Sequence, residues 1–440
     1  MQLPNAEKLT QKLPESFCSV PWLQIHTEPD GKVFPCCYYG HAENHKLGNW
    51  NDQKIKDIFH GDKWNELRKD FLDGKKPVAC SRCWKEEDSG IVSMRQKFNE
   101  RYHNFPDYNY KNLYDKFTDI INETKTDGSV GDIKLATIDL IFNNICNMKC
   151  RTCGPGLSTA WMADSKKLNR KNNNLVTLLT NETVTHMKDD LVTLVEMVDP
   201  CTEIHFSGGE PMMQEDHYKF LQLLIDMGKT KIKIRYNTNM TVFILKEYNA
   251  FEMLQHFENV FIVGSCDSMG KQGEYIRKGF DWEKALDWLK TCKEYLPNAE
   301  YGVSAVYSLL NASTAIDLHR YMCESKLFRR GNGQPFGFYL NTLSEPYYLK
   351  TTLLPSDVKL EVTEKINKHI EWLSDTQEHD IHYNVYLEHW KNAIIFMNSA
   401  DNSNIIPIFY NRTNLLDDIR NEKFEDVFPE LHEKMKPYDK

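Results

Sequence analysis

The 440-residue sequence lacks the features of a membrane or secreted protein. No apolar run approaches the roughly 18 residues that a membrane-spanning helix needs. Residues 1–14 are polar and contain no apolar core of a signal peptide. We therefore expect no membrane partner and a cytoplasmic location.

The sequence also lacks an excess of basic residues. Lys and Arg total 54 against 63 Asp and Glu, a formal net charge of -9 at pH 7. Such a charge disfavours general binding to the phosphate backbone of nucleic acids. With 41% apolar and 27% charged residues and no internal repeat, the composition excludes a disordered or fibrous chain. The length allows two or three domains.

The chain contains twelve cysteines, which are too few for a disulfide scaffold at this length. In a reducing compartment these cysteines are expected to be thiols or metal ligands. Eight of them form two groups, within residues 18–83 and 146–153. The other four lie in or beside helical or strand patterns, and we interpret them as small buried side chains: Cys201, Cys266, Cys292 and Cys323.

Residues 1–90 have the character of a small module pinned by cysteines, which are Cys18, Cys36, Cys37, Cys80 and Cys83. Asp30-Gly31, flanked by apolar residues, predicts a β-hairpin. The apolar spacing over residues 51–72 predicts a helix. We expect residues 91–133 to form a connecting helix and a linker.

Residues 134–345 alternate between short apolar runs and helical patterns. The predicted strands are residues 135–142, 203–207, 232–236, 260–263, 302–307 and 337–340, and the predicted helices include 217–227, 243–256, 282–295 and 312–323. This order predicts an α/β fold with a parallel sheet, and it leaves open whether the sheet closes. Residues 346–440 are predicted to be mainly helical, with Ser356 as the cap of a helix over 358–373.

Three cysteines follow the first predicted strand: Cys146, Cys150 and Cys153. Three thiolates in one short loop can bind three corners of an iron–sulfur cube and leave the fourth iron without a protein ligand. Zinc is the weaker interpretation, because zinc sites more often use a C-x2-C pair with a distant second pair. Three merely structural cysteines within eight residues are less expected still.

A second motif, residues 207–211 with the sequence SGGEP, follows the second predicted strand. Its glycines let a backbone approach a ligand closely, and Glu210 offers a carboxylate to an ammonium group. Because parallel strands end at the same edge of a sheet, this motif should face the cysteine loop.

The two motifs together resemble the radical S-adenosylmethionine (SAM) superfamily. The resemblance implies a partial (β/α)6 TIM-like barrel with a [4Fe-4S] cluster on the three cysteines and SAM bound to the open iron. It implies that the SAM-binding residues are Gly208, Gly209, Glu210, Pro211, Asn237, Asn239, Ser265, Asp267 and Arg277. It also makes Cys266 a candidate hydrogen donor. The chain departs from the family at Thr152, where an aromatic residue is usual.

The N-terminal module resembles a SPASM or twitch auxiliary-cluster domain, which in most relatives follows the barrel. The resemblance rests on Phe17-Cys18, Pro21-Trp22, Asp30-Gly31-Lys32-Val33, Pro35-Cys36-Cys37, Leu47-Gly48-Asn49 and Cys80-Ser81-Arg82-Cys83. It implies a second [4Fe-4S] cluster on Cys18, Cys36, Cys80 and Cys83, with Cys37 as an alternative to Cys36. A structural zinc site is the competing interpretation. The arrangement also resembles twitch-domain radical SAM proteins that bacteriophages often encode.

These resemblances imply an enzyme that cleaves SAM reductively to a 5′-deoxyadenosyl radical, which then removes hydrogen from a substrate. The expected substrate is a peptide or protein side chain; the alternative is a small molecule such as a sugar, aminocyclitol or nucleotide. A non-enzymatic metal-binding adaptor is a third interpretation. The reaction would be an oxidation or another radical-based modification, and a flavodoxin or ferredoxin would donate electrons.

Overall fold

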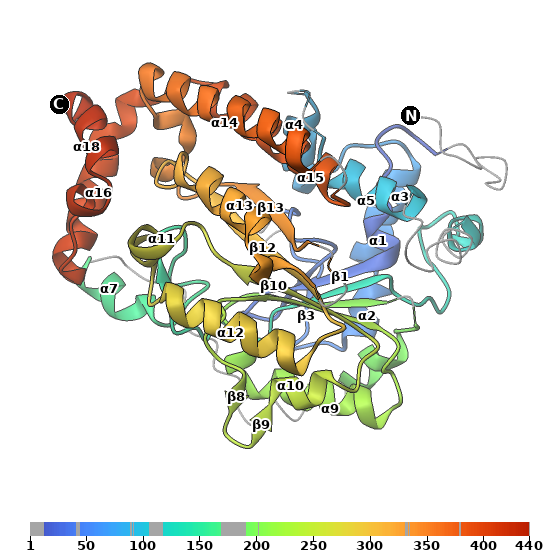
Figure 1. Ribbon diagram of the computed structural model, residues 1–440. Coiled ribbons are helices and arrows are strands. Elements are labelled where there is room, and N and C mark those ends of the chain that lie inside the picture. The colour runs from blue at the N-terminus through green and yellow to red at the C-terminus, as the bar shows by residue number, and fades with distance from the viewer. Residues whose placement is uncertain are drawn as a thin grey trace.

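The protein, seen in a computed structural model, is an α/β molecule built around one curved sheet (Figure 1). The structure describes residues 13–40, 45–88, 90, 92–104, 118–168, 191–200, 202–330, 333, 335–377 and 380–439. Cys201 lies outside these residues.

Six parallel strands form the main part of the sheet in the order of the sequence. They are β4 (Thr137–Leu140), β6 (Glu203–Phe206), β7 (Lys233–Thr238), β10 (Asn259–Ser265), β12 (Glu300–Tyr307) and β13 (Gly337–Thr342). Each begins and ends within two residues of a predicted strand, which confirms the parallel α/β fold.

The crossover helices pack on one face of this sheet and bury their apolar sides there. They are α9 (Glu215–Asp226), α10 (Ala250–Leu254), α12 (Trp282–Tyr295) and α13 (Thr314–Glu324). The contact between α9 and β7 is typical, because His217 and Tyr236 are both buried and hydrogen-bonded to each other (2.5 Å). Along the strands, the apolar side chains that face these helices alternate with polar side chains on the other face of the sheet, such as Asp139, His205 and Arg235.

One predicted helix, over residues 243–256, was wrong in its first half. Residues 244–249 form a hairpin, β8 (Ile244–Leu245) and β9 (Tyr248–Asn249), and Lys246 has a positive φ of 53° in its turn. The extended Asn249 accepts a hydrogen bond from the Phe251 N–H as an N-cap (3.0 Å). The helix α10 therefore begins only after this cap.

The sheet does not close among the described strands, which makes the barrel a partial one. At its open edge, β13 packs against α15 (Tyr383–Asn398). The backbone N–H of Leu340 donates to Nδ1 of His389 on that helix (3.3 Å). The His389 side chain thus accepts a hydrogen bond from a backbone N–H at the edge of the sheet, where a further strand would otherwise bind.

At the opposite edge, the N-terminal module continues the same sheet. The strand β1 (Gln24–Thr27) pairs in parallel with β4, and β2 (Lys32–Phe34) and β3 (Gly48–Asn49) follow in antiparallel register. The predicted hairpin is confirmed, and Gly31 at its turn has a φ of 81°, which favours glycine.

The helices of this module are short. They are α1 (Val20–Leu23), α2 (Ile55–Phe59), α3 (Asp62–Leu72) and α4 (Ser81–Asp88), and α5 (Met94–Asn104) follows in the segment for which a connecting helix was predicted. The single helix predicted over residues 51–72 is two helices, because the chain turns at His60 and the extended Gly61 becomes the N-cap of α3. Both helices bury apolar faces, so the periodicity was right and only the break was missed.

The C-terminal region is helical, as predicted. Its helices are α14 (Ser356–Gln377), α15, α16 (Ile406–Arg420), α17 (Phe424–Val427) and α18 (Pro429–Met435). Ser356 is the first residue of α14 and not a cap outside it. The remaining short elements are β5 (Lys149–Cys150), α7 (Trp161–Lys167), α11 (Gly270–Ile276), β11 (Arg277–Lys278) and the 3-10 turns Val78–Cys80, Pro211–Met213, Lys326–Phe328, Tyr347–Leu349, Thr351–Leu353, Ser403–Ile405 and Lys436–Tyr438.

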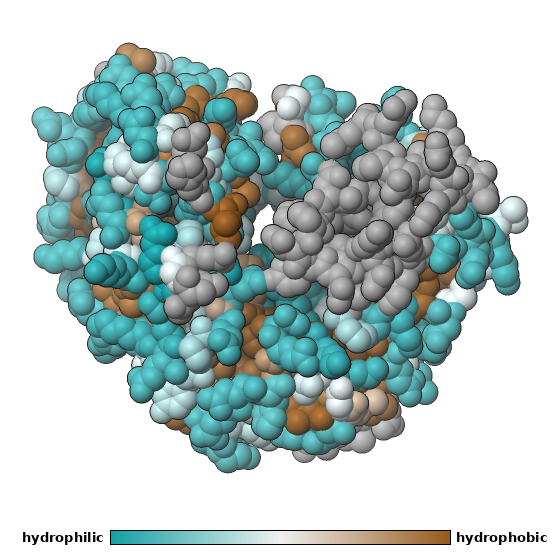
Figure 2. Space-filling model, turned by 45° about the vertical axis from the view of Figure 1, so that its right-hand side comes forward, coloured by the Kyte–Doolittle hydropathy of each residue, from teal (hydrophilic) through white to brown (hydrophobic). Residues whose placement is uncertain are grey.

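The face of the molecule seen in Figure 2 is mostly hydrophilic, with small hydrophobic patches. Within the described ranges, the search for a helix both long and apolar enough to span a bilayer found none.

A buried ionic link joins β1 of the module to β4 of the barrel. His26 contacts Asp139 through Nδ1 (2.8 Å) and Glu28 through Nε2 (3.0 Å). Burial opposes a charge on His26, but the hydrogen bonds to the two carboxylates outweigh it and raise its pKa to about 9. The protonated imidazole therefore lies between two carboxylates at the junction of the two sheet segments.

We expect this link to stabilise the protein fully below the usual His pKa and to be lost as the pH rises through about 9. The shift corresponds to a contribution on the order of 3 kcal/mol. Chemical unfolding of His26→Gln and wild type should therefore give a difference in unfolding free energy at pH 6 that shrinks at pH 10. The exposed His256 takes no part in this link, and His256→Gln is the control for the loss of a histidine elsewhere. An unchanged difference across this range would contradict the charged link.

Candidate active site

The cysteine loop follows β4 at the carboxyl end of the sheet. Its second cysteine, Cys150, lies in β5, which pairs with β11 so that Cys150 is opposite Arg277. All three thiols are partly exposed. The loop thus brings together the predicted cluster ligands and one of the residues predicted to bind SAM.

The chemistry of this loop fits an iron–sulfur cluster with one open iron. Burial raises the pKa of Cys150 to about 12 and that of Cys153 to about 11, and Cys146 is raised as well. The three cysteines lie within eight residues of one loop. Such thiols ionise only when a metal binds, and cluster assembly at this loop must therefore release protons.

Two N–H donors approach the sulfur atoms of the loop. Asn239 Nδ2 lies 3.7 Å from Cys146 Sγ, and Arg277 Nη1 lies 3.8 Å from Cys150 Sγ. Asn239 also donates to Asn147 Oδ1 (2.8 Å). Donors at these positions favour the thiolate form of the cysteines.

The glycines of the second motif let its loop pack directly on the cysteine loop. A Cβ on Gly208, whose φ is 70°, would lie 2.3 Å from Ile141 Cγ2, and one on Gly209, whose φ is 46°, would lie 2.4 Å from the Ile145 carbonyl oxygen. The next N–H, that of Glu210, donates to the same oxygen (2.7 Å). Any other residue type at either glycine would push the two loops apart.

Glu210 joins the end of β6 to the end of β7. It is fully buried, and its carboxylate accepts hydrogen bonds from Thr238 Oγ1 (2.8 Å), Asn239 N (2.6 Å) and Met212 N (3.3 Å). Burial outweighs these bonds and raises its pKa to about 7. Pro211, also buried, follows as the first residue of a 3-10 turn.

We expect Glu210→Gln to weaken SAM binding roughly tenfold or more while leaving the iron content intact. The amide would remove the charge that suits the SAM ammonium, and its NH2 group would meet the N–H of Asn239 or the hydroxyl of Thr238. Isothermal titration of anaerobic protein with SAM measures this change. The control is Glu215→Gln at the partly exposed start of α9; equal affinities of the two variants would exclude a role for Glu210.

Arg277 forms a buried ion pair with Asp267, two residues beyond the end of β10. Arg277 Nε lies 2.8 Å from Asp267 Oδ2, and Nη2 donates to Oδ1 (3.1 Å). Asp267 also accepts the Val306 N–H (2.7 Å). Burial opposes the charge on Arg277, but Asp267 and the neighbouring thiols outweigh it and raise its pKa. The pair holds the guanidinium beside Cys150.

The other predicted contacts lie nearby on the strands. Ser265 is half-buried at the end of β10, and Asn237 lies in β7 with a buried Oδ1 that has no hydrogen-bond partner. Cys266 is buried, and its thiol donates to the Ser268 carbonyl oxygen (3.3 Å), which agrees with its interpretation as a small buried side chain. Cys292 and Cys323 are buried as well.

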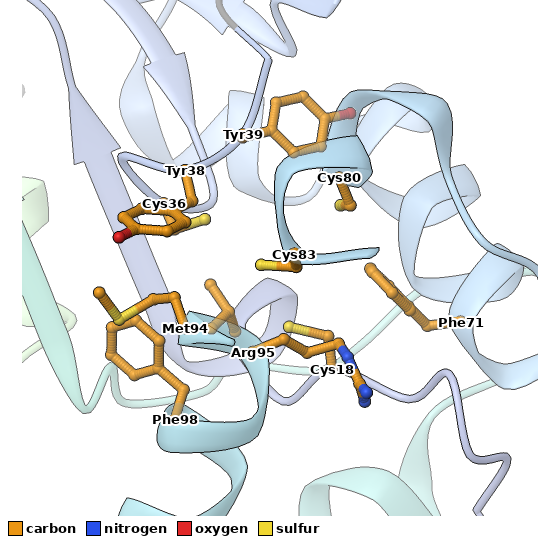
Figure 3. A pocket seen from close by; sticks show the side chains of 11 residues that line it. Cys18, Cys36, Tyr38, Tyr39, Phe71, Cys80, Cys83, Met94, Arg95 and Phe98 are labelled. Atoms are coloured by element: carbon orange, nitrogen blue, oxygen red, sulfur yellow. The ribbon is translucent and has the colours of Figure 1, made fainter. Parts of the chain in front are cut away.

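Four cysteines of the N-terminal module surround one pocket, whose volume including its mouth is about 330 Å³. Figure 3 shows Cys18, Cys36, Cys80 and Cys83 around this space. Cys37 is exposed and does not line the pocket, so Cys36 is the better ligand of the two.

Four cysteines that line one pocket can bind either a [4Fe-4S] cluster or a zinc ion. Burial raises the pKa of Cys18 and Cys36 to about 12, so metal binding here also requires proton release.

The sequence interpretation missed one group of residues at the cysteine loop. Arg151, between the second and third cysteines, pairs with Asp417 and with Glu422 from the C-terminal region. These partners lie 266 and 271 residues further along the chain, and no local motif marks them.

Two family models match the sequence. The radical SAM superfamily model matches residues 140–319, and the SPASM model, described as an iron–sulfur cluster-binding domain, matches residues 18–84. The two matches indicate a radical SAM domain with a SPASM-type domain before it, and the cofactors that such domains hold are SAM, a [4Fe-4S] cluster and additional iron–sulfur. The description of the second model favours iron–sulfur over zinc in the N-terminal module.

Solved structures are similar at low identity. Native anSMEcpe with bound AdoMet is 17% identical with a TM-score of 0.39, and the match covers 56% of this chain and 62% of that one. Streptococcus suis SuiB bound to precursor peptide SuiA is 17% identical with a TM-score of 0.34, covering 68% and 60%. The chain thus spans less than two thirds of either. No curated protein sequence matches this chain.

Proposed function

We propose that the protein cleaves SAM reductively and uses it to remove hydrogen from a peptide or protein side chain. The observation that carries the proposal is that the cysteine loop, the glycine loop (residues 207–211) and Arg277 meet at the carboxyl ends of the parallel strands. The chemistry that cluster and SAM supply together, given a reductant, is cleavage of the sulfonium and removal of a hydrogen atom.

The protein's own residues bind and orient. Cys146, Cys150 and Cys153 would hold the cluster and leave one iron to the amino and carboxylate groups of SAM. Glu210 suits the ammonium end and Arg277 the carboxylate end of the methionyl group. The packing of the glycine loop on the cysteine loop supports this placement, since it fixes Glu210 relative to the cysteines.

The N-terminal pocket would hold the auxiliary cluster on Cys18, Cys36, Cys80 and Cys83. Ligation by four cysteines leaves no open iron, which favours electron transfer or an architectural role over binding of a second SAM. The continuous sheet supports electron transfer, because it fixes the module beside the barrel through β1 and β4.

The substrate class is supported by polar groups on the sheet face opposite the crossover helices. Three buried atoms on this face have no hydrogen-bond partner among the residues that the structure describes: His205 Nε2, Arg235 Nε and Asn237 Oδ1. Arg235 is in register with His205 on the neighbouring strand. Arg235 Nε is a donor and Asn237 Oδ1 is an acceptor, and such a pair suits an amide-bearing substrate such as a peptide, whose N–H and C=O need both.

Mass spectrometry of a host lysate treated with the anaerobically reconstituted, reduced protein tests this proposal. We expect 5′-deoxyadenosine together with a mass change on a peptide or protein, absent with the Cys146/Cys150/Cys153→Ala variant. A change confined to the small-molecule fraction would replace the substrate class by the alternative one. Absence of 5′-deoxyadenosine from a preparation with full iron content would contradict the reaction itself.

A further inference from the structure

The C-terminal helix α16 buries charged side chains against the radical SAM domain. Asp417 is 5% exposed and Arg420 is 7% exposed. Figure 1 shows α16 running down to α7 and α11, elements more than a hundred residues earlier in the chain. Buried charges are costly unless paired, so their partners indicate what this helix does.

Asp417 contacts the segment between the second and third cluster cysteines. Its Oδ1 binds Nη2 of Arg151, whose side chain is 3% exposed. The same Nη2 lies 2.9 Å from Glu422 Oε2. Arg151 stacks on the ring of Tyr275, with 3.6 Å from Cζ to the ring centroid, and its Nε donates to the Tyr275 carbonyl oxygen (3.1 Å). The side chain of Arg151 is thus held from several directions.

Asp417 also holds α11. Tyr275 Oη donates to the carboxylate at 2.9 and 3.1 Å from its two oxygens. Two residues after Tyr275 comes Arg277, which lies opposite Cys150 in the β5–β11 pair. Lys278, the next residue, binds Glu422 (2.8 Å). The same acidic groups therefore fix both strands of the pair that carries Cys150 and Arg277.

Arg420, one helical turn after Asp417, holds the other side of the loop. Its Nε lies 2.9 Å from Asp164 Oδ2, and Asp164 Oδ1 accepts from Lys149 Nζ (3.0 Å). Its guanidinium lies 4.6 Å from the centroid of a Trp161 ring, and Trp161 Nε1 donates to the Cys150 carbonyl oxygen (3.0 Å). The helix α16 thus contacts Arg151 directly and reaches Lys149 and the Cys150 carbonyl through Asp164 and Trp161 of α7.

We propose that α16 is a positioning element for the cluster loop, with Asp417 as its central residue. Asp417 sets the distance between Cys150 and Arg277 through Arg151 and Tyr275, while Arg420 holds α7 against the loop. The inference rests on the proposed function, since it assigns a role toward the cluster and SAM. Buried ion pairs add little net stability but can fix one geometry, which is the property that a cluster site with one open iron needs.

The test compares Asp417→Asn with Asp418→Asn in the full, reconstituted protein. Asp418 is the next residue on the same helix and is exposed, so both variants lose one charge and only the first loses the contacts. For Asp417→Asn we expect roughly tenfold weaker SAM binding and an altered electron paramagnetic resonance spectrum of the reduced cluster upon SAM addition. Asp418→Asn should match wild type in both, and equal behaviour of the two variants would overturn the proposal.

A double-mutant cycle shows whether Asp417 acts through Arg151. The SAM affinity of Arg151→Gln/Asp417→Asn should equal that of the worse single variant, whereas additive losses would overturn the coupling. Tyr275→Phe removes only one hydroxyl group, so this variant should fold even if Asp417→Asn does not. It should weaken SAM binding by a smaller factor than Asp417→Asn does. Unchanged binding and an unchanged spectrum in Tyr275→Phe would overturn the part assigned to α11.

Iron content separates this inference from the proposed function. A wild type that carries both clusters but neither binds nor cleaves SAM would overturn the function. The positioning role would then be judged on iron alone: Asp417→Asn should lose iron faster to a chelator than Asp418→Asn. In the Cys146/Cys150/Cys153→Ala background the two variants should lose iron equally, and a difference there would show that Asp417 acts elsewhere.

Discussion

Replacing Cys146, Cys150 and Cys153 together by Ala is expected to abolish the cleavage of SAM and to remove about half of the iron. Two four-iron clusters give about eight irons per chain, and the variant should retain about four on the N-terminal cysteines. The loss is complete because no other group in the loop can bind iron in place of the thiolates. Anaerobic assay of 5′-deoxyadenosine and colorimetric iron determination measure the two effects.

The matched control changes two other buried cysteines, as Cys292→Ala/Cys323→Ala. These side chains are buried in the crossover helices α12 and α13, and the variant should keep its iron and its SAM cleavage. A triple variant that still produced 5′-deoxyadenosine at the wild-type rate would exclude the loop as the cluster site.

Cys36→Ser is expected to remove the iron of the auxiliary cluster, while Cys37→Ser keeps it. The two cysteines are adjacent in sequence, but only Cys36 lines the pocket with Cys18, Cys80 and Cys83. Because the four ligands are far apart in sequence, metal binding closes long loops and should stabilise the module directly. Iron content should fall from about eight to about four in Cys36→Ser, and thermal unfolding should begin at a lower temperature.

The barrel cluster is the internal control of this experiment, since Cys36→Ser should still cleave SAM when a chemical reductant is supplied. Loss of iron in Cys37→Ser with full iron in Cys36→Ser would reverse the ligand assignment. Stoichiometric zinc with only about four irons in wild type prepared with both metals would return the module to the zinc interpretation and remove its electron-transfer role.

Local chemistry explains why the main sheet and the cysteine loop were predictable. In β4, β6 and β7 apolar residues alternate with polar ones, and burial of every second side chain under the crossover helices requires this pattern. The close spacing of Cys146, Cys150 and Cys153 indicates a cluster because few other functions require three thiols in one loop. The predictions failed where a short-range signal competed with periodicity, as at Gly61 and Asn249, where N-cap conformations begin a new helix.

The role of Glu210 was only partly predictable. Its carboxylate was expected to face a ligand, and the structure adds three hydrogen bonds that fix it between the ends of β6 and β7. The partners Thr238 and Asn239 lie 28 and 29 residues away, on a strand whose register the sequence does not specify.

The sequence by itself determined the class of chemistry, because ligand type and spacing within a loop are local properties that do not depend on the rest of the fold. Tertiary structure alone decided three further matters. It placed the N-terminal module on the edge of the barrel sheet through β1 and β4, it put Cys36 in the lining of the pocket while Cys37 is exposed, and it brought Asp417 to Arg151. Each depends on a contact between distant segments, and such contacts follow from packing and buried charge pairing, which leave no periodic or local pattern in the chain.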